Sequence, residues 1–242
     1  MIAGRQFHFR PVLTICAALG LAILVSLGSW QLQRLAWKEA LIEKVEARAS
    51  SPPLSLQSAL DALSGGEDLE YARIRIEGVF DHDGEAHVFG TYEGQPGYYI
   101  FTPMILTSGE RIYVNRGFAL QNRKSQASRQ DSLVSGAVVV TGLIRAAEKR
   151  KGVASFFQPA DNPDANRWFV RDPARFAAEG ADALNAFYVD SDGSENAAEW
   201  PKGGTTRLEF RNRHLEYALT WFGLAGALLA VWMAFSLKSS EK

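Results

Sequence analysis

The chain has 242 residues, a formal net charge of −1 and a single cysteine, Cys16. The near-neutral charge and the absence of a basic stripe exclude nucleic acid as an expected partner. One cysteine cannot form an internal disulfide or a Cys-x-x-Cys pair, which excludes those two kinds of cysteine chemistry. Apolar residues make up 47% of the chain but concentrate at its two ends, a distribution that the average composition hides.

Residues 11–30 read PVLTICAALGLAILVSLGSW and carry no charge. About 20 residues at a rise of 1.5 Å each are enough to cross a hydrocarbon core of about 30 Å. A cleaved signal peptide is the alternative, because Arg5 and Arg10 form a basic leader. The apolar stretch is longer than a usual signal core, however, and no Ala-x-Ala site follows. The pattern therefore favours a retained span, preceded by a short tail of residues 1–10.

A second uncharged run occupies residues 217–237 and predicts a membrane helix at 214–237, followed by a tail of residues 238–242. It is apolar on every face, which disfavours a half-buried helix of a soluble core. Two spans place both termini on one side of the membrane. Basic residues flank both ends of both runs, so charge alone does not choose that side. Small residues recur at helical spacing in both runs, which favours packing of one span against the other.

Residues 31–213 are predicted to form a domain outside the membrane. The first helix continues amphipathically over residues 31–49 and ends before Pro52-Pro53, because proline cannot continue a helix. A short helix over residues 56–63 follows, and another is expected to start at Pro173.

Elsewhere in this domain the hydrophobic period is two, which indicates half-buried strands. Asp83-Gly84 and Ser108-Gly109 are turn signals that predict two hairpins. The expected strands are residues 71–80, 86–92, 98–106, 111–114 and 137–144, with weaker candidates at 168–171 and 187–190. The predicted fold is a membrane α+β protein, in which two transmembrane helices flank a mainly antiparallel, small barrel-like β domain with short helices.

No catalytic motif of a hydrolase, nucleotide-binding protein or metalloprotease is present, so we expect the protein not to be an enzyme. His82 and His87 flank the Asp83-Gly84 turn. They form either an imidazole pair across a hairpin or, as we favour, two solvated turn histidines. No Ser–His–Asp set can be assembled from the four histidines of the chain.

His214 lies immediately before the second apolar run. On a helix, positions 214, 217, 221, 224 and 228 share one face, which places an imidazole at the membrane boundary above an aromatic and apolar surface. A neutral imidazole is a good axial ligand for haem iron, and arginines nearby can meet haem propionates. The alternative is an interfacial histidine without a ligand, which physical chemistry alone favours.

Both ends of the chain resemble a known family. Residues 28–38, GSWQLQRLAWK, are similar to the GxWQxxRxxWK signature of the surfeit-locus family of cytochrome c oxidase assembly factors. Residues 212–222, NRHLEYALTWF, are similar to its NxHLxYAxTW[FY] signature. Between them, further matches follow in the family's order: Tyr71, Gly78, Phe80, Gly97, Thr102, Pro103, Gly109 and Val114-Asn115-Arg116-Gly117. The family commonly has a histidine pair where this chain has Arg213 and His214, so the family's ligand position falls on His214.

The resemblance implies an assembly factor for haem–copper cytochrome c oxidase that binds haem a at the membrane interface and aids its insertion into the catalytic subunit. Haem a synthase is a further candidate partner, and the lipid bilayer is a third. Haem a would be carried rather than used in catalysis, with His214 as the axial ligand of its iron. The expected haem-binding residues are His214, Tyr217, Trp221, Trp30, Arg211, Arg213 and Gly28.

The resemblance also implies a location. The central domain is expected in the periplasm, with both termini in the cytoplasm. Only ten residues precede the first span and they do not resemble a transit peptide, so we expect a bacterial inner membrane.

Two residues carry open interpretations. Gly28 either lets the backbone bend or lets a flat ligand or the second helix approach closely. Arg116 is expected to be a structural partner of an acidic group in the domain, with a role in docking as the less favoured alternative. For the whole protein, the alternative function is a haem-free, membrane-anchored chaperone or scaffold of the oxidase catalytic subunit. A membrane-anchored periplasmic hydrolase is the alternative from the enzyme class, and the missing nucleophile motif argues against it.

Overall fold

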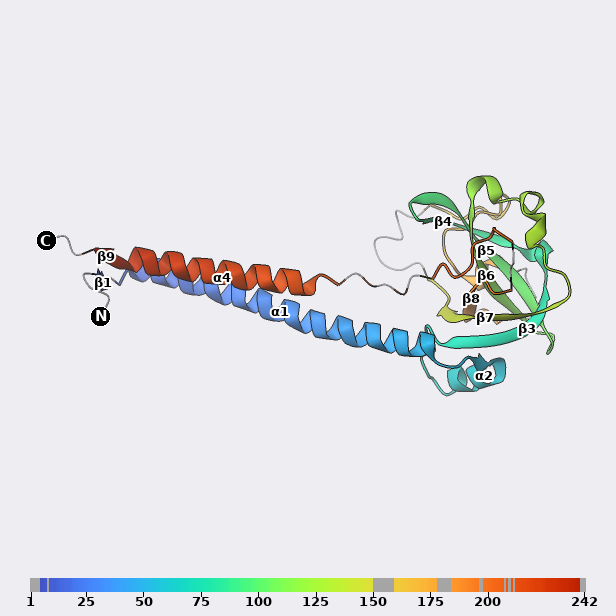
Figure 1. Cartoon of the computed structure of the whole chain (residues 1–242), viewed down its shortest axis with the longest axis horizontal. Helices are drawn as coiled ribbons and strands as arrows, with labels where there is room; N and C mark the ends of the chain where they lie inside the picture. Colours follow the sequence, from blue (N-terminus) through green and yellow to red (C-terminus); the bar gives the residue numbers. More distant parts are fainter. Residues whose placement is uncertain are drawn as a thin grey trace. The chain divides into compact units, whose positions relative to one another are not determined.

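The structure is a computed structural model that describes residues 5–7, 9–149, 159–177, 184–195, 198–206, 208, 210 and 212–239. The chain divides into two compact units, which are described separately (Figure 1). The helical unit contains Met1–Lys44 and Glu209–Lys242, and the β unit contains Val45–Leu208.

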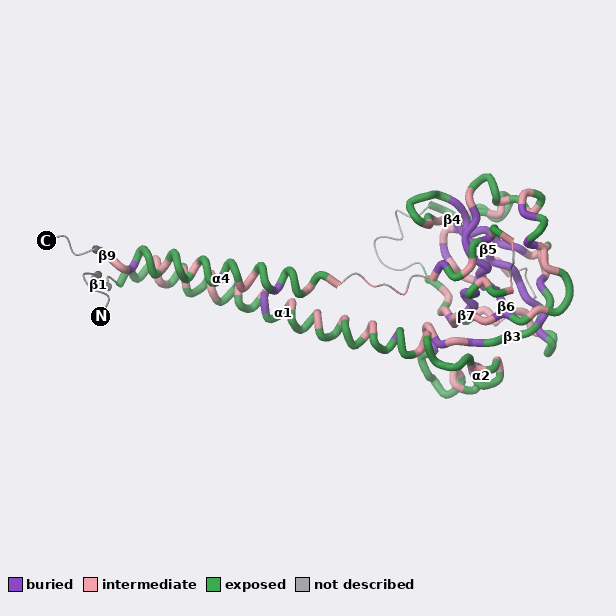
Figure 2. The backbone as a smooth tube through the Cα atoms, viewed as in Figure 1, coloured by how far each residue is buried: buried purple, intermediate pink, exposed green. Residues whose placement is uncertain are grey.

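Two helices dominate the helical unit: α1 (Pro11–Ser50) and α4 (His214–Ser236). Both are long and apolar enough to cross a membrane, and their most apolar 18-residue windows are only 6% and 11% buried. The green and pink colouring along both helices in Figure 2 shows the same exposure. Such exposure argues against core helices of a soluble protein, and the two candidate spans fit a membrane protein.

Helices α1 and α4 lie side by side and antiparallel (Figure 1). Contacts between them run in opposite directions along the two sequences: Thr14 with Trp232, Gly20 with Leu228, Gly28 with Phe222, and Gln31 with His214. Next to them, β1 (Arg5–Phe7) pairs antiparallel with β9 (Leu237–Ser239). The predicted packing of span against span is therefore present.

The prediction that the first span continues as a helix is confirmed, because α1 runs without interruption to Ser50. At 1.5 Å per residue its 40 residues extend about 60 Å, far more than a bilayer requires. Ser51 donates its hydroxyl to the carbonyl of Ala47 at 2.7 Å, and prolines follow. Helix α2 (Leu56–Ser64) then begins where Ser55 caps the amide of Ser58 at 3.1 Å.

The β unit contains one seven-stranded sheet with the order β2-β3-β7-β8-β6-β5-β4. Its strands are β2 (Leu54–Ser55), β3 (Arg73–Phe80), β4 (Ala86–Tyr92), β5 (Gln95–Leu106), β6 (Arg111–Leu120), β7 (Ala137–Ala146) and β8 (Phe187–Ser191). Strand β3 also pairs with β5, so that β3, β7, β8, β6 and β5 form a ring. All pairings are antiparallel except β2–β3 and β6–β8. The predicted mainly antiparallel domain is confirmed, and short helices including α3 (Pro173–Phe176) complete it.

One predicted hairpin is wrong. Strands β3 and β4 flank the Asp83-Gly84 turn, but neither pairs with the other. Both pair instead with the twelve-residue β5, which meets β4 with residues 95–101 and β3 with residues 104–106. The turn, a 3-10 helix over His82–Gly84, therefore crosses from one partner of β5 to the other. A hairpin signal reports a local turn and carries no information about a third strand that arrives later in the chain.

The second predicted hairpin is present, since β5 and β6 pair antiparallel around Ser108-Gly109. The strand expected at residues 168–171 is wrong: Trp168 makes only an isolated parallel bridge to Val88. The weaker candidate at residues 187–190 is confirmed as β8, every residue of which is buried.

A buried ionic cluster lies between β4 and the segment of short 3-10 turns that follows β6. The Glu85 carboxylate accepts hydrogen bonds from Nε2 of His87 at 2.5 Å and from the Arg129 guanidinium. All three residues are buried, so the interpretation of His87 as a solvated turn histidine is wrong. His82 does not face His87 as a pair; its Nε2 contacts the carbonyl of Val134 at 2.9 Å.

Burial alone would raise the pKa of Glu85. The hydrogen bond from His87 and the charge of Arg129 outweigh burial, so the pKa of Glu85 is lowered from its ordinary value of 4.5.

We predict that Glu85→Gln strongly destabilises the protein. The substitution keeps the size of the side chain but leaves the buried Arg129 without a counter-charge, which typically costs about 3–5 kcal/mol. Glu77→Gln is the matched control, because Glu77 is exposed on the neighbouring strand β3; its effect should be about 0.5 kcal/mol or less. Denaturant unfolding of the full chain in detergent measures both. Equal effects of the two substitutions would contradict a structural role for the cluster.

We also predict that the free energy of unfolding depends on pH through the protonation of Glu85. Because its pKa is lower in the folded than in the unfolded protein, its contribution is complete above pH 4.5 and is lost as pH falls through the folded pKa. The unfolding free energy of the wild type should therefore fall more steeply below pH 4.5 than that of Glu85→Gln. Parallel curves for the two proteins would show that Glu85 gains no proton-linked stability on folding.

Candidate functional site

The candidate site is built around the first turn of α4. The side chain of Asn212 accepts the backbone amide of His214 at 3.3 Å, and the amide of Tyr217 donates to the carbonyl of Arg213 at 3.2 Å. The first bond satisfies an amide that the start of a helix otherwise leaves without an intrahelical acceptor, and the second is the first backbone bond of the helix itself. The helix consequently begins with His214 in a fixed position at the edge of an uncharged segment.

The imidazole of His214 contacts α1. Its Nδ1 lies 2.7 Å from Oε1 of Gln31, 183 positions away in sequence. An amide oxygen can only accept a hydrogen bond, so Nδ1 carries the proton and Nε2 of a neutral ring carries the lone pair. Within the part of the chain that the structure describes, no hydrogen bond engages Nε2. The ring is held through one nitrogen, and the other remains available as a metal ligand.

Gly28 is buried about one turn before Gln31, at a contact between α1 and α4. A Cβ atom at this position would lie 2.7 Å from the ring of Phe222, too close for an ordinary contact. Ala218 and Ala225 of α4 are buried as well. Of the interpretations of Gly28, the structure supports close approach of the second helix.

The remaining predicted site residues differ in how far their side chains are exposed. Trp30 and Tyr217 are each about half exposed, whereas Trp221 is half-buried. Arg213 is exposed and its Nε lies 4.0 Å from the carboxylate of Glu216. Arg211 lies outside the described residues. The structure therefore brings His214 to α1, leaves two aromatic rings on the exposed surface and leaves one of the two arginines on that surface.

Two further cations belong to the helical unit near these residues. The guanidinium of Arg34 lies 4.6 Å from the ring centre of Trp37, and the ammonium of Lys38 lies 4.8 Å from that of Phe210. Stacking on an aromatic face orients a cation without neutralising it. Both residues can therefore still attract acidic groups of a ligand or lipid.

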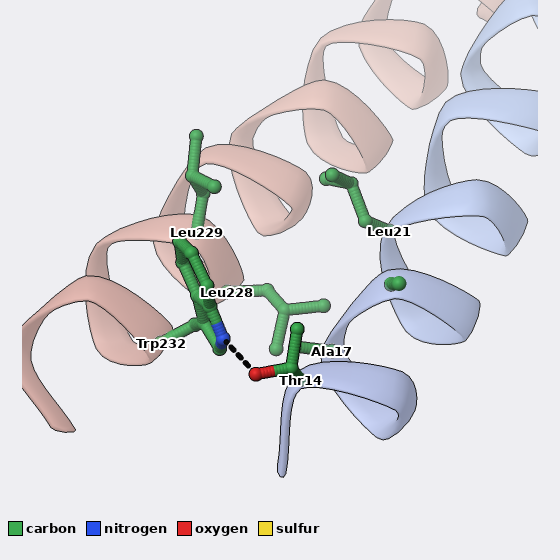
Figure 3. A pocket seen from close by; sticks show the side chains of 7 residues that line it. Thr14, Ala17, Leu21, Leu228, Leu229 and Trp232 are labelled. Carbon is green, nitrogen blue, oxygen red and sulfur yellow. Dashed lines mark hydrogen bonds between the residues drawn. The ribbon is translucent and has the colours of Figure 1, made fainter. Parts of the chain in front are cut away.

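The opposite end of the helix pair contains an apolar pocket of about 230 Å³. Figure 3 shows Trp232 reaching across from α4 to donate a 3.3 Å hydrogen bond to the hydroxyl of Thr14. The lining residues are Thr14, Ala17, Ala18, Leu21, Leu228, Leu229 and Trp232. None of them is among the predicted site residues, and the polar groups of the lining side chains are the Thr14 hydroxyl and the Trp232 indole N–H, which bond to each other.

The VNRG segment of β6 is structural. Asn115 donates to the buried carboxylate of Asp190 at 2.7 Å and accepts the amide of Gly117 at 3.1 Å. Gly117 has φ +117°, and a Cβ there would collide with the backbone of Lys202. These contacts fix the backbone of β6 at Gly117 and let the distant segment at Lys202 approach it closely.

Arg116 is fully buried. The acidic partner expected for it is not its hydrogen-bond acceptor: Nη2 donates to the carbonyl of Ser132 at 2.6 Å, and the guanidinium stacks on Phe80 at 4.8 Å. Burial lowers the pKa of Arg116, and the carboxylates of Glu195 and Glu85 act against that shift. Glu195 and Glu85 act on it through their charge only, so the expected direct pairing with an acidic group is absent among the described residues, and its described contacts all lie within the domain.

Two exposed apolar helices and a ring-like antiparallel sheet, with a histidine at the first turn of the second helix, fit a membrane-anchored protein with a folded domain. Comparison with known proteins then identifies the family. The sequence model of the SURF1 family matches residues 18–226. The chain is 33% identical over 228 residues to Surfeit locus protein 1 of Mus musculus, covering 87% of this chain and 71% of that one.

Two other relatives agree. Surfeit locus protein 1 of Homo sapiens is 32% identical over 232 residues, covering 88% of this chain and 74% of that one. Surfeit locus protein 1 of Takifugu rubripes is 31% identical over 235 residues, with 90% and 94% coverage. The chain belongs to the SURF1 family, as its two end motifs predicted.

Sequence reasoning missed Gln31 as a member of the site, although it lies within the first end motif. The signal that points to it is positional. Two antiparallel spans place the end of the first apolar run beside the start of the second, so the polar residue after Trp30 faces the residue that opens the second helix. Asn212 was missed as well. Its signal is an asparagine just before a predicted helix start, because such a side chain can accept a hydrogen bond from an amide of the first turn.

We predict that Gly28→Leu weakens the helix pair. The larger side chain would displace the Phe222 ring, and overpacking of this kind costs about 1–3 kcal/mol. Gly223→Leu is the matched control, because a Cβ at Gly223 meets no atom within 4 Å. Titration with sodium dodecyl sulfate from a mild detergent, followed by circular dichroism, measures the stability. Adding Phe222→Ala to Gly28→Leu should restore part of the loss; a loss that persists unchanged would assign Gly28 another role.

Proposed function

We propose that this protein assists assembly of haem–copper cytochrome c oxidase by holding haem a at His214 and releasing it to the catalytic subunit. Membership of the SURF1 family supports the role in oxidase assembly. The observation that supports the haem site is the imidazole of His214, which is fixed through Nδ1 and has Nε2 without a hydrogen bond among the described residues. This is the state that a metal-ligating histidine requires.

The residues around His214 fit such a cargo. Haem iron needs one strong protein ligand on a face, and a neutral imidazole is the commonest. The half-exposed rings of Trp30 and Tyr217 and the half-buried Trp221 offer apolar surface for the macrocycle. Arg213, Arg34 and Lys38 offer positive charge for its propionates, and Arg211 is the fourth candidate in the sequence. The protein's task in this proposal is to bind and orient the haem and to shield it, not to turn over a substrate.

The proposed setting is the inner membrane of a bacterium, with both termini in the cytoplasm and the β domain in the periplasm. The two candidate spans support a membrane location. In this setting haem a synthase would supply the cargo, and the oxidase catalytic subunit would receive it. In this proposal the β domain, which lies outside the membrane, would dock the subunit.

We predict that His214→Ala abolishes haem a binding. The full chain is purified in detergent from cells that make haem a, and haem content and absorption spectrum are measured per mole of protein. Removal of the iron ligand should reduce haem content at least about tenfold. His82→Gln is the control, because it removes another imidazole that contacts only the domain carbonyl of Val134 among its described hydrogen bonds. Unchanged haem content and spectrum in His214→Ala would refute the proposed ligand.

A haem-free wild-type protein that still restores oxidase assembly in a deletion strain would favour the alternative, a scaffold that holds the catalytic subunit without carrying haem. In that case His214→Ala should leave oxidase assembly intact or impair it only through the stability of the helix pair. The same strains therefore distinguish the two functions.

A further inference from the structure

We infer that Gln31 is the positioning residue of the haem site: it selects the tautomer of His214, aims Nε2 and sets how strongly that nitrogen donates to iron. The inference rests on the proposed function and goes beyond it, because it assigns part of the site to the other helix. The observation is the 2.7 Å contact between Nδ1 of His214 and Oε1 of Gln31.

The chemistry of the two groups gives this contact a direction. A neutral imidazole has one N–H and one lone pair, and the hydrogen bond made by one nitrogen decides which is which. An amide oxygen has no proton to donate, so the bond requires Nδ1–H and leaves the lone pair on Nε2. Without the acceptor both tautomers would be populated, and the ring would be free to rotate about its own bonds.

The same bond changes the ligand itself. An acceptor at Nδ1 draws its proton away from the ring and increases electron density at Nε2, which raises the basicity of the ligand. A stronger acceptor, such as a carboxylate, increases this effect and favours ferric over ferrous iron. An apolar side chain at position 31 removes the effect. The nature of residue 31 should therefore be visible in the reduction potential of the bound haem, not only in the amount bound.

Gln31 itself is held in place by helix packing. It lies three residues after Gly28, whose missing side chain lets Phe222 of α4 come into contact. The contacts of Thr14 with Trp232 and Gly20 with Leu228 continue the same antiparallel register toward the other end. Residue 31 thus faces the start of α4 because the whole helix pair is in register, and a rigid support of this kind keeps a positioning residue precise.

The experiment compares four proteins purified in full length from haem-a-producing cells: wild type, Gln31→Leu, Gln31→Glu and the control Gln33→Leu. Gln33 is two residues away on the exposed side of the same helix. Gln31→Leu should bind haem a about 10–100-fold more weakly, the usual effect of removing a hydrogen-bond partner of a metal-bound histidine. Gln33→Leu should match the wild type.

The reduction potential of the bound haem distinguishes a positioning role from a merely structural one, because a merely structural change at residue 31 would not shift it. Gln31→Glu should keep haem and shift the potential downward relative to the wild type, whereas the residual haem in Gln31→Leu should shift upward. Gln31→Glu also tests the direction of the bond, because a carboxylate accepts but does not donate. Loss of haem in Gln31→Glu would mean that residue 31 acts as a donor to Nδ1, and it would overturn the inference.

The outcomes separate this inference from the proposed function. If His214→Ala loses haem while Gln31→Leu matches the wild type in affinity and potential, His214 is a ligand and Gln31 has no positioning role. If the wild type carries no haem a, the proposed function and the inference fail together. Opposite shifts in potential for the Leu and Glu substitutions, with an unchanged Gln33→Leu control, would establish it.

Discussion

The close approach of α1 and α4 at Gly28 is the constraint on which the arrangement of the helical unit depends. A glycine backbone against the Phe222 ring brings the helix axes near each other, and no larger residue fits without displacement. Inside a bilayer there is no hydrophobic force between apolar helices, so such close packing and occasional hydrogen bonds must hold them. The bonds between Trp232 and Thr14 and between His214 and Gln31 are two such hydrogen bonds among the described residues.

The two units differ in what surrounds their polar side chains. In the β unit, buried Asp190 accepts bonds from Asn115 at 2.7 Å, Arg145 at 3.0 Å and Thr206 at 2.8 Å. Glu85 is likewise held by two donors. Such groups stabilise the domain only while every partner is present. His82 and His87 each leave Nδ1 without a hydrogen bond among the described residues, but both atoms are enclosed by the fold. His214 differs, because its unbonded Nε2 is not among these enclosed atoms, and a ligand must reach the nitrogen that it binds.

The sequence was sufficient to predict the first span and strand β3, because each follows from a pattern of neighbouring residues. The uncharged run at residues 11–30 predicted the first span, and alternation around Ile74 and Ile76 predicted β3, because burial on one face repeats every second residue. It failed for the pairing of β3, whose partners β5 and β7 come later in the chain and are not encoded by the turn that follows it. It also missed Gln31, since the contact that gives this residue meaning joins positions 183 apart. Motif resemblance pointed to the junctions at residues 28–38 and 212–222, but only the helix register showed which of their side chains meet.

His214 lies on α4 and the acceptor of its hydrogen bond lies on α1, and this arrangement has a thermodynamic consequence. If iron binds Nε2 best when Nδ1 is bonded to Gln31, then haem binding favours the paired state of α1 and α4, and pairing favours haem binding by the same factor. A partner that pulls the helices out of register at the His214 end would therefore weaken the iron–histidine bond without touching the haem. If the second ring nitrogen of a histidine ligand were bonded to an acceptor on its own helix, its iron bond would not depend on the pairing of the two helices. In the proposed carrier, the location of the acceptor on α1 would let the protein hold haem firmly and still release it when a partner separates the two helices.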